Sequence, residues 1–312
     1  MPSKGELQKA IKKALGTNTF HPTGASGGGC INEGSVYETD DGLVYVKTND
    51  RWLSKEVFDG EMAGLTEIAS TGTIRVPEPK IVVQSPKGND SALVMEYIDM
   101  SSCRNQNTLG THLARMHLHN LGRKDEMDYV TRFGFHIDTS CGFNKQPNDW
   151  NRDWVTFFTT ERLGHQFFLL QKEGLGGDAE YELWHELKHR IPYFFAGISE
   201  IIPALLHGDL WSGNVAQTND SHKVPVIFDP ACFYGHHEYD LGITDMFGGF
   251  NSSFYDAYHA VIPKEPGFEN RHKLYQLFHY LNHWNHFGSG YKDQSIRLTK
   301  ELIKAILIDT FF

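Results

Sequence analysis

The sequence predicts an α+β protein with two lobes, a small lobe built around an antiparallel sheet and a larger, mainly helical lobe. Two observations lead to this prediction. Alternating apolar and polar residues separated by turn signals dominate the first part of the chain, whereas apolar residues at helical spacing dominate the rest. The change in pattern divides the chain into residues 1–99 and residues 100–312, and 312 residues are enough to bury a core in each lobe.

The small lobe is expected to begin with a short amphipathic helix in residues 1–16. In residues 34–49, side chains alternate on both flanks of Asp40-Asp41-Gly42. A tight-turn signal between two alternating runs predicts a β-hairpin.

A second helix is expected in residues 52–71, with Ser54 as its N-cap and Gly72 just beyond its end. Two short strands should follow, in residues 80–84 and 92–98, because a turn-rich segment separates two apolar runs. These elements complete the sheet-bearing lobe.

The large lobe is expected to be helical, with only one further strand, in residues 224–229. Ligand sites are common between two such lobes. The expected helices are residues 109–121, 154–174, 179–191, 272–288 and 294–308.

Composition and charge exclude several classes of partner. The net charge of −10 argues against a nucleic-acid partner, and no apolar run is long enough for a membrane span or a signal core. The four cysteines form no Cys-x-x-Cys pair, so a reducing compartment is expected. We therefore expect a cytoplasmic protein; a trimmed organelle-targeting peptide is the alternative left open.

The segment PALLHGDLWSGNVAQ, residues 203–217, carries the strongest chemical signal. His207, Asp209 and Asn214 reproduce the His-x-Asp-x₄-Asn spacing of a kinase catalytic loop. In that pattern Asp209 accepts a hydrogen bond from the attacking hydroxyl, and Asn214 is an uncharged oxygen ligand for Mg²⁺. An ordinary polar loop is the alternative interpretation.

Asp229 ends the expected strand of residues 224–229, where a second metal-binding carboxylate belongs in a kinase. Pro230 and Ala231 follow it instead of Phe-Gly, and no Ala-Pro-Glu motif occurs downstream. Since the activation segment of a protein kinase is missing, the pattern favours a kinase that acts on small molecules.

Lys47 ends the VYVK run of the expected hairpin, and Glu61 lies on the helix after it. A strand lysine held by a helix glutamate contacts the nucleotide phosphates in kinases. Glu56 is the rival partner, and a plain surface lysine is the alternative for Lys47.

The glycine-rich residues 24–34 precede the hairpin, and Gly27, Gly28 and Gly29 would let backbone N–H groups approach the phosphates of ATP. A flexible loop is the alternative. Cys30 in this stretch is a candidate redox switch, through a disulfide with a second subunit, so the chain is expected to be a monomer or a redox-linked homodimer. A small buried hydrophobic residue is the other interpretation of Cys30.

Three of the 17 histidines, His279, His283 and His286, share one helix face. No cysteine or acidic residue accompanies them within that segment. A helix wall of hydrogen-bonded histidines is therefore favoured over a zinc site.

Several long runs resemble the fructosamine kinase (ketosamine 3-kinase) family, which is related to aminoglycoside phosphotransferases and choline kinases. The runs are GGGCINEGSVYETDDGLVYVK, LLHGDLWSGNV, FDPACFYGHHEYDLGI, MFGGF and LYQLFHYLNHWNHFG, and the likeness covers residues 27–290. The resemblance implies a protein-kinase-like fold and Mg²⁺- and ATP-dependent phosphorylation of the sugar 3-hydroxyl of ketosamines. The acceptors would be fructosamine or ribulosamine adducts on small amines or protein lysines, and phosphorylation makes the adduct labile, so the implied role is protein repair.

The resemblance also implies roles for individual residues. Trp211 becomes a platform for the sugar, with a core anchor as the alternative, and Asp240 becomes a structural brace of the catalytic loop. The remaining carried-over roles are proton acceptor for Asp209, Mg²⁺ ligand for Asn214 and Asp229, phosphate contact for Lys47 with Glu61, and adenine-binding hinge for Glu96, Tyr97 and Ile98.

Two alternatives to a ketosamine kinase stay open at this point. The first is another small-molecule phosphotransferase, acting on an aminoglycoside or on an amino alcohol such as choline. The second is a catalytically inactive, redox-responsive pseudokinase that binds nucleotide, although a scaffold has no need to keep Lys47, Asp209, Asn214 and Asp229 together.

Overall fold

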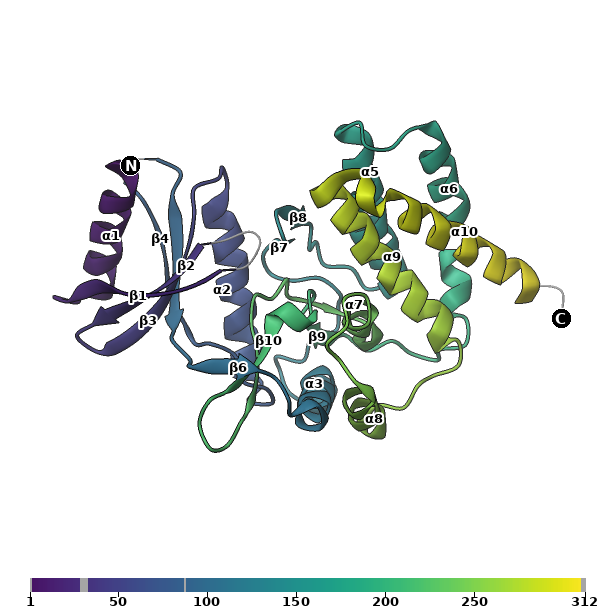
Figure 1. Cartoon of the computed structure of the whole chain (residues 1–312). Helices are drawn as coiled ribbons and strands as arrows, with labels where there is room; N and C mark the ends of the chain where they lie inside the picture. The colour runs from purple at the N-terminus through teal and green to yellow at the C-terminus, as the bar shows by residue number, and fades with distance from the viewer. Residues whose placement is uncertain (1, 29–32, 87, 310–312) are drawn as a thin grey trace.

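The computed structural model describes residues 2–28, 33–86 and 88–309. Its elements form two lobes, a sheet with two helices at the left of Figure 1 and a larger, mostly helical body at the right. The predicted α+β class is confirmed. Strand β6 (Met100–Ser102) follows this sheet along the chain and pairs with a strand of the larger body.

A five-stranded antiparallel sheet with the order β1-β2-β3-β5-β4 forms the small lobe. The predicted hairpin is confirmed, since Thr39 pairs with Gly42 across its turn. The first strand was not predicted, and it includes Gly27 and Gly28, which pair with Gly34 and Glu33. The strands are β1 (Phe20–Gly28), β2 (Glu33–Thr39), β3 (Gly42–Asn49), β4 (Pro79–Gln84) and β5 (Ser91–Glu96).

Helices α1 (Pro2–Leu15) and α2 (Ser54–Ser70) cover opposite faces of this sheet. Residues of strand β5 alternate between them, because successive side chains of a strand point to opposite faces. Val94 belongs to the apolar cluster that contains residues of α1, and Leu93 to the cluster that contains residues of α2. The same alternation in β3 places Val46 on the α1 side and therefore Lys47 on the α2 side.

The start of α2 differs from the prediction. Ser54 was expected to cap the helix, but the cap position is Leu53, with φ of 68°. The Ser54 hydroxyl donates to Asn89 O at 2.7 Å instead, because the chain between β4 and β5 passes close to it. Gly72 follows the helix with φ of 61°, as expected of a residue beyond a helix C-terminus.

Two glycines of α2 let this helix approach the large lobe closely. A Cβ on Gly60 would lie 2.8 Å from Asp138 O, and one on Gly64 would lie 2.7 Å from Cys232 Cβ. The two positions are four residues apart and so share one face of the helix. This face holds α2, and with it Glu61, against the large lobe.

The large lobe packs around α9 (Phe268–Phe287), whose buried residues include Leu274, Phe278 and Trp284. The predicted helices are present, although residues 154–174 are divided by a π-helical turn at Phe158–Gly164. Helix α8 (Ser252–Val261), which packs on α3, was not predicted. The other helices are α3 (Gln106–His119), α4 (Trp154–Phe157), α5 (His165–Lys172), α6 (Asp178–Lys188), α7 (Leu241–Thr244) and α10 (Lys292–Asp309).

The expectation of a single strand in the large lobe was wrong, because the described part of this lobe contains seven short strands. Each has three or four residues, which is too short to show a repeat of two. They form small sheets with the orders β11-β10-β6, β12-β9 and β7-β8. The strands beyond β6 are β7 (Thr139–Cys141), β8 (Asn144–Gln146), β9 (Ala204–Leu206), β10 (Val215–Thr218), β11 (Pro225–Ile227) and β12 (Phe233–Gly235).

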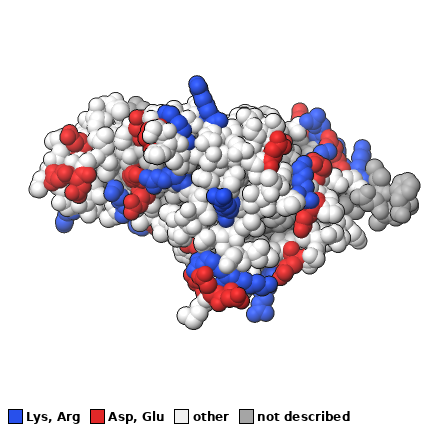
Figure 2. Space-filling model, turned by 90° about the horizontal axis from the view of Figure 1, so that it is seen from below, with Lys and Arg blue, Asp and Glu red and all other residues white. Residues whose placement is uncertain are grey.

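The surface seen from below mixes charges of both signs with broad neutral areas (Figure 2). The net charge of −10 is therefore not gathered into one acidic face on this side. Among the described residues, no helix has the length and apolar character that crossing a bilayer requires.

Candidate active site

The predicted catalytic loop connects β9 to β10, and two pairs of short strands hold it opposite the segment that carries Asp229. Strand β9 pairs with β12, and β10 pairs with β11. The N–H of Ala231 donates to His207 O at 2.8 Å, and the N–H of Phe228 donates to Asn214 O at 3.1 Å. Both ends of the loop are thus tied to the chain on either side of Asp229.

Within the loop, Asn214 lies against Asp209. Its Nδ2 donates to the backbone oxygen of Asp209 at 2.8 Å and to Asp209 Oδ2 at 3.3 Å. Burial, together with the negative charge of Asp229, raises the pKa of Asp209 to about 7. Because its pKa is raised, the charged form of this carboxylate is stabilised by any hydrogen-bond donor or cation that lies next to it.

Asp240 braces the loop from behind. It is fully buried, and its two carboxylate oxygens accept hydrogen bonds from the backbone N–H groups of His207 and Gly208, each at 2.8 Å. His117 Nε2 lies 3.0 Å from Asp240 Oδ2. The position of Asp240 agrees with the structural role expected for it.

Gly208 is required at its position for two reasons. Its φ is 84°, and a Cβ there would lie 2.1 Å from Ala231 O. No other residue fits without moving the backbone. Protein kinases have an arginine at this position of the motif. The glycine here lets the loop approach the strand connection after Asp229.

His207 positions the backbone around Asp209 and does not face a substrate. It is fully buried; its Nε2 lies 2.9 Å from Phe228 O, and its Nδ1 accepts the N–H of Asp209 at 3.3 Å. Since Nδ1 accepts, the proton is on Nε2. Burial lowers the pKa of His207, so the ring is neutral.

Lys47 joins the two lobes through carboxylates. Its buried Nζ lies 2.7 Å from both oxygens of Glu61 and 2.9 Å from Asp229 Oδ1. Burial favours the neutral amine, but the charges of Asp229 and Glu61 outweigh it and raise the pKa of Lys47. The lysine therefore carries a full positive charge, and the structure pairs it with Glu61 rather than with Glu56.

Asp229 has a backbone conformation that is uncommon for a residue with a side chain, with φ of 58°. Its side chain is 38% exposed, unlike those of Lys47 and Glu61. Strained backbone of this kind is frequent at functional sites. Asp229 therefore combines access to solvent with a fixed position between Lys47 and the catalytic loop.

The residues expected to bind the nucleotide lie at the sheet edge and after β5. Gly27 and Gly28 end strand β1, whereas Gly29 and Cys30 lie outside the described residues. The N–H of Glu96 donates to Glu78 O at 2.8 Å, and its side chain forms an ion pair with Arg75. The N–H of Glu96 is thus engaged by Glu78 and is not available to hydrogen-bond an adenine.

After Glu96 the chain leaves the sheet. Tyr97 and Ile98 belong to no strand or helix and are partly exposed. Any adenine contact from the expected hinge therefore depends on these two residues and on backbone oxygens.

Trp211 lies beside the catalytic loop and is partly exposed. Its ring packs over Gly213, where a Cβ would come within 2.2 Å of the indole. The ring of Phe247 meets it edge to face at a centroid distance of 6.0 Å, and Phe247 is 41% exposed. Trp211 also packs against the core, as expected of a core anchor, and its role as a platform for the sugar stays a prediction.

Sequence reasoning missed two residues near the loop, Phe247 and Cys141. Phe247 lies in the run MFGGF, which could have drawn attention as an exposed aromatic beside glycines. Cys141, on β7, contacts Asp209 through its thiol, and no local pattern indicates this. The expectation of hydrogen-bonded histidines was wrong for His279, because neither of its ring nitrogens has a partner among the described residues.

His283 and His286, on the same helix face, are hydrogen-bonded as expected. His283 Nδ1 lies 2.8 Å from His279 O, and His286 Nε2 accepts the N–H of Phe143 at 2.8 Å. Both rings thus serve local structure.

The geometry suits transfer of a phosphoryl group to an alcohol. The partly exposed carboxylate of Asp209 can orient a hydroxyl, an amide and a second carboxylate offer oxygen ligands, and a buried lysine provides positive charge.

Comparison with known proteins identifies the family. The fructosamine kinase family profile matches residues 4–305. The chain is 49% identical over 316 residues to the ketosamine-3-kinase of Mus musculus, covering 96% of this chain and 100% of the relative. It is 43% identical to a chloroplastic protein-ribulosamine 3-kinase of Arabidopsis thaliana, covering 91% of this chain and 83% of the relative.

Solved structures show the same fold. A putative fructosamine-3-kinase from Haemophilus somnus superimposes with a TM-score of 0.80 at 24% identity, covering 97% of this chain and 99% of the other. The aminoglycoside phosphotransferase APH(4)-Ia, in a ternary complex with ADP and hygromycin B, gives a TM-score of 0.59 at 12% identity, covering 96% and 97%. The fold is therefore the two-lobed protein-kinase-like fold that these enzymes share, and the chain belongs to the fructosamine kinase family.

Proposed function

We propose that this protein is an ATP-dependent kinase that phosphorylates the 3-hydroxyl of the sugar in ketosamines. The observation that carries the proposal is the convergence of Asp209, Asn214 and Asp229 in front of the charged Lys47. The names of the relatives, ketosamine-3-kinase and protein-ribulosamine 3-kinase, support this acceptor class. An aminoglycoside or amino-alcohol acceptor is less favoured, because identity to the aminoglycoside phosphotransferase is only 12%.

ATP would lie between residues 1–99 and residues 100–312, which we propose as the two lobes. Gly27, Gly28 and Gly29 would approach its phosphates, and the segment of Glu96, Tyr97 and Ile98 would receive the adenine. Support for a nucleotide comes from the related fold that binds ADP. Lys47, oriented by Glu61, would contact phosphate oxygens and offset the negative charge that develops on them.

The donor set at the loop fits Mg²⁺. Asn214 uses its nitrogen for both hydrogen bonds to Asp209, so its Oδ1 is the atom available to a cation. Asp229 offers a partly exposed carboxylate. Oxygen donors of this kind are those that Mg²⁺ prefers, and a bound ion would neutralise phosphate charge.

Asp209 would orient the sugar hydroxyl and take its proton as the bond to phosphorus forms. The chain forms no covalent bond to the phosphoryl group, so alignment and electrostatics supply the rate gain. Trp211 and Phe247 would face the apolar side of the sugar. The 3-phosphate makes the adduct labile, so the amine is recovered, and the role is repair of glycated small amines or protein lysines.

The test is to follow ADP release with Mg·ATP and a panel of acceptors, namely fructosyl-lysine, ribulosyl-lysine, choline and an aminoglycoside. Turnover on a ketosamine alone supports the proposal. Turnover on choline or the aminoglycoside alone, or on none of the panel, contradicts it.

We also propose that the protein is cytoplasmic and is a monomer that Cys30 can link into a redox-dependent homodimer. Non-reducing gels after peroxide treatment test this. A dimer band in the unmodified chain that is lost in Cys30→Ala supports the proposal, and identical monomer bands contradict it.

A further inference from the structure

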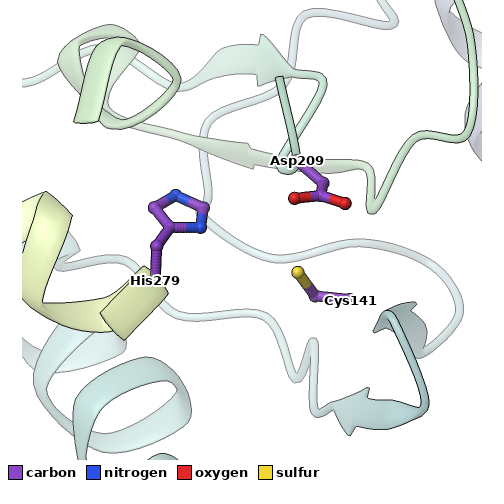
Figure 3. Close-up of side chains that lie close together, drawn as sticks. All are labelled: Cys141, Asp209 and His279. Atoms are coloured by element: carbon purple, nitrogen blue, oxygen red, sulfur yellow. The ribbon is translucent and has the colours of Figure 1, made fainter. Parts of the chain in front are cut away.

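Behind the catalytic loop, three side chains from separate elements point toward one another (Figure 3). Cys141 comes from β7, Asp209 from the loop after β9, and His279 from α9. Their ligand atoms, a thiol sulfur, a carboxylate oxygen and an imidazole nitrogen, all lie within 4.8 Å of one another. Nothing in the proposed phosphoryl transfer uses Cys141 or His279.

His279 is the unexplained member of this group. It is fully buried, and neither ring nitrogen has a hydrogen-bond partner among the described residues. A buried polar group without a partner destabilises the folded protein unless a ligand or solvent molecule occupies the space in front of it. Burial lowers the pKa of His279 to about 3, so the ring is neutral and the nitrogen that carries no hydrogen can bind a metal.

The sulfur of Cys141 is oriented by Asn282. Asn282 Oδ1 accepts hydrogen bonds from Asn144 Nδ2 at 3.0 Å and from Gln166 Nε2 at 3.3 Å. Its nitrogen must therefore be the atom that faces Cys141 Sγ, at 3.1 Å. A donor aimed at a sulfur favours a thiolate and is the kind of outer contact that supports metal-bound cysteines.

The local charge also favours a cation. Burial and the negative charge of Asp209 raise the pKa of Cys141 well above its usual range. A metal ion between the two groups would reverse this, because it would attract both a thiolate and a carboxylate. The charge of the buried Arg162 acts in the opposite direction on the pKa of Cys141 and does not outweigh these two causes; its Nη atoms donate to Pro147 O and Asn148 Oδ1.

We propose that Cys141, Asp209 and His279 form a binding site for a borderline-soft divalent cation of the Zn²⁺ type, and that occupation of this site inhibits the enzyme. Ligand distances of about 2.0–2.3 Å in a tetrahedral zinc site place neighbouring ligand atoms roughly 3.3–3.7 Å apart, so only small side-chain movements are needed. Water would complete the coordination. Asp209 is the one partly exposed ligand, so the ion would reach the site from the substrate side.

The proposal separates this cation from the Mg²⁺ of the reaction. Thiolate and imidazole donors select zinc-like ions, whereas Mg²⁺ prefers oxygen ligands. Binding displaces the thiol proton of Cys141 to solvent. It also engages the carboxylate that would otherwise face the sugar hydroxyl, so inhibition rests on the proposed function, whereas metal binding does not.

The test uses the full-length chain carrying Cys30→Ser, freed of metal with a chelator and titrated with Co²⁺ as a spectroscopic probe. We expect one Co²⁺ per chain with a thiolate-to-cobalt absorption band, which added Zn²⁺ removes and excess Mg²⁺ does not. The band should be lost in Cys141→Ser and in His279→Gln. It should remain in Cys232→Ser, the matched control, because Cys232 is equally buried and its thiol pKa is likewise raised by burial.

Absence of the band in the parent chain, or its persistence in Cys141→Ser or His279→Gln, overturns the proposal. Thermal unfolding followed by circular dichroism checks that the variants fold. A measurement without ligand variants is the alkylation of Cys141, which Zn²⁺ should slow at least tenfold while the alkylation of Cys232 is unchanged; equal rates at Cys141 with and without Zn²⁺ contradict the site.

Activity separates the two proposals. With Mg·ATP and a ketosamine, Zn²⁺ should inhibit the parent chain, and Cys141→Ser should raise the inhibitory Zn²⁺ concentration at least tenfold. If no acceptor is turned over but the cobalt band depends on Cys141 and His279, the proposed function fails and the metal site stands. Turnover that is insensitive to bound Zn²⁺ overturns the inhibition.

Discussion

Asp240 accepts hydrogen bonds from the backbone N–H groups of both His207 and Gly208, at 2.8 Å each. One buried carboxylate thus fixes two consecutive peptide groups immediately before Asp209. The backbone conformation of the loop therefore depends on Asp240, which does not have to contact the substrate.

Asp240→Asn should lower turnover and stability together. An amide nitrogen would face one of the two N–H donors, which leaves a buried donor unsatisfied at a cost of about 2 kcal/mol. Urea denaturation followed by fluorescence measures the loss. As a control, Asp220→Asn changes an exposed carboxylate at a surface turn, and we expect a loss well below that of Asp240→Asn.

The stability that Asp240 contributes should depend on pH. Burial alone would raise its pKa, but the hydrogen bond and charge of His117 and the other donors outweigh burial and lower the pKa below its usual 3.8. Since the folded pKa is the lower one, the contribution is present above pH of about 4 and is lost as the pH falls through the folded pKa. The difference in unfolding free energy between the parent and Asp240→Asn should therefore shrink below pH of about 4; a difference that grows in acid would contradict this.

Lys47→Met should reduce kcat/KM for ATP by about 100-fold or more, because it removes the charge that faces the phosphates. Steady-state kinetics with varied ATP measures this. Lys55→Met is the matched control, since Lys55 lies on α2 in a partly exposed ion pair with Asp59. Its kcat/KM for ATP should be close to that of the parent. An unchanged kcat/KM in Lys47→Met would mean that the phosphate site is elsewhere.

Gly208→Ala should be strongly destabilising, because its Cβ would overlap Ala231 O and its φ is 84°. Gly72→Ala is the control. The φ of Gly72 is also positive, at 61°, but no atom lies within 4 Å of the position that its Cβ would take. The control isolates the backbone cost, roughly 1–2 kcal/mol. Thermal melts should show a clearly larger drop in Tm for Gly208→Ala, and equal drops would show that the close approach is not required.

Trp211→Ala should raise KM for the ketosamine while KM for ATP stays the same, because on the proposed function the indole faces the sugar and not the nucleotide. Burial of one aromatic face corresponds to about tenfold. Trp52→Ala controls for loss of an exposed indole, since Trp52 is 75% exposed. Equal changes in both KM values would indicate that Trp211 acts as a core anchor.

Local patterns predicted much of this fold. The hairpin around residues 40–42 and the helices α2, α3 and α9 follow from turn residues and apolar spacing that lie within one element. The three-residue strands β9 and β12 do not, because they are stable only through pairing with each other. The spacing of Asp209 and Asn214 was readable because one loop holds both.

The group behind the loop could not be predicted in this way. Cys141 and His279 lie on elements far apart in the sequence, and only the packing of α9 on the chain between β7 and β8 brings them to Asp209. His279 was assigned to a helix wall because its own segment contains no cysteine or carboxylate. Residues that are brought together only by tertiary packing have no characteristic spacing in the sequence, so no motif search can find them.

Lys47 Nζ contacts Glu61 from its own lobe and Asp229 from the other, so a single ammonium group links the two halves of the molecule. On the proposed function, arrival of Mg·ATP is an exchange of partners. Asp229 would serve as an oxygen ligand of Mg²⁺, and Lys47 would contact a phosphate oxygen in place of Asp229. The direct contact between the two halves at Lys47 would then be replaced by contacts that each half makes with the bound nucleotide.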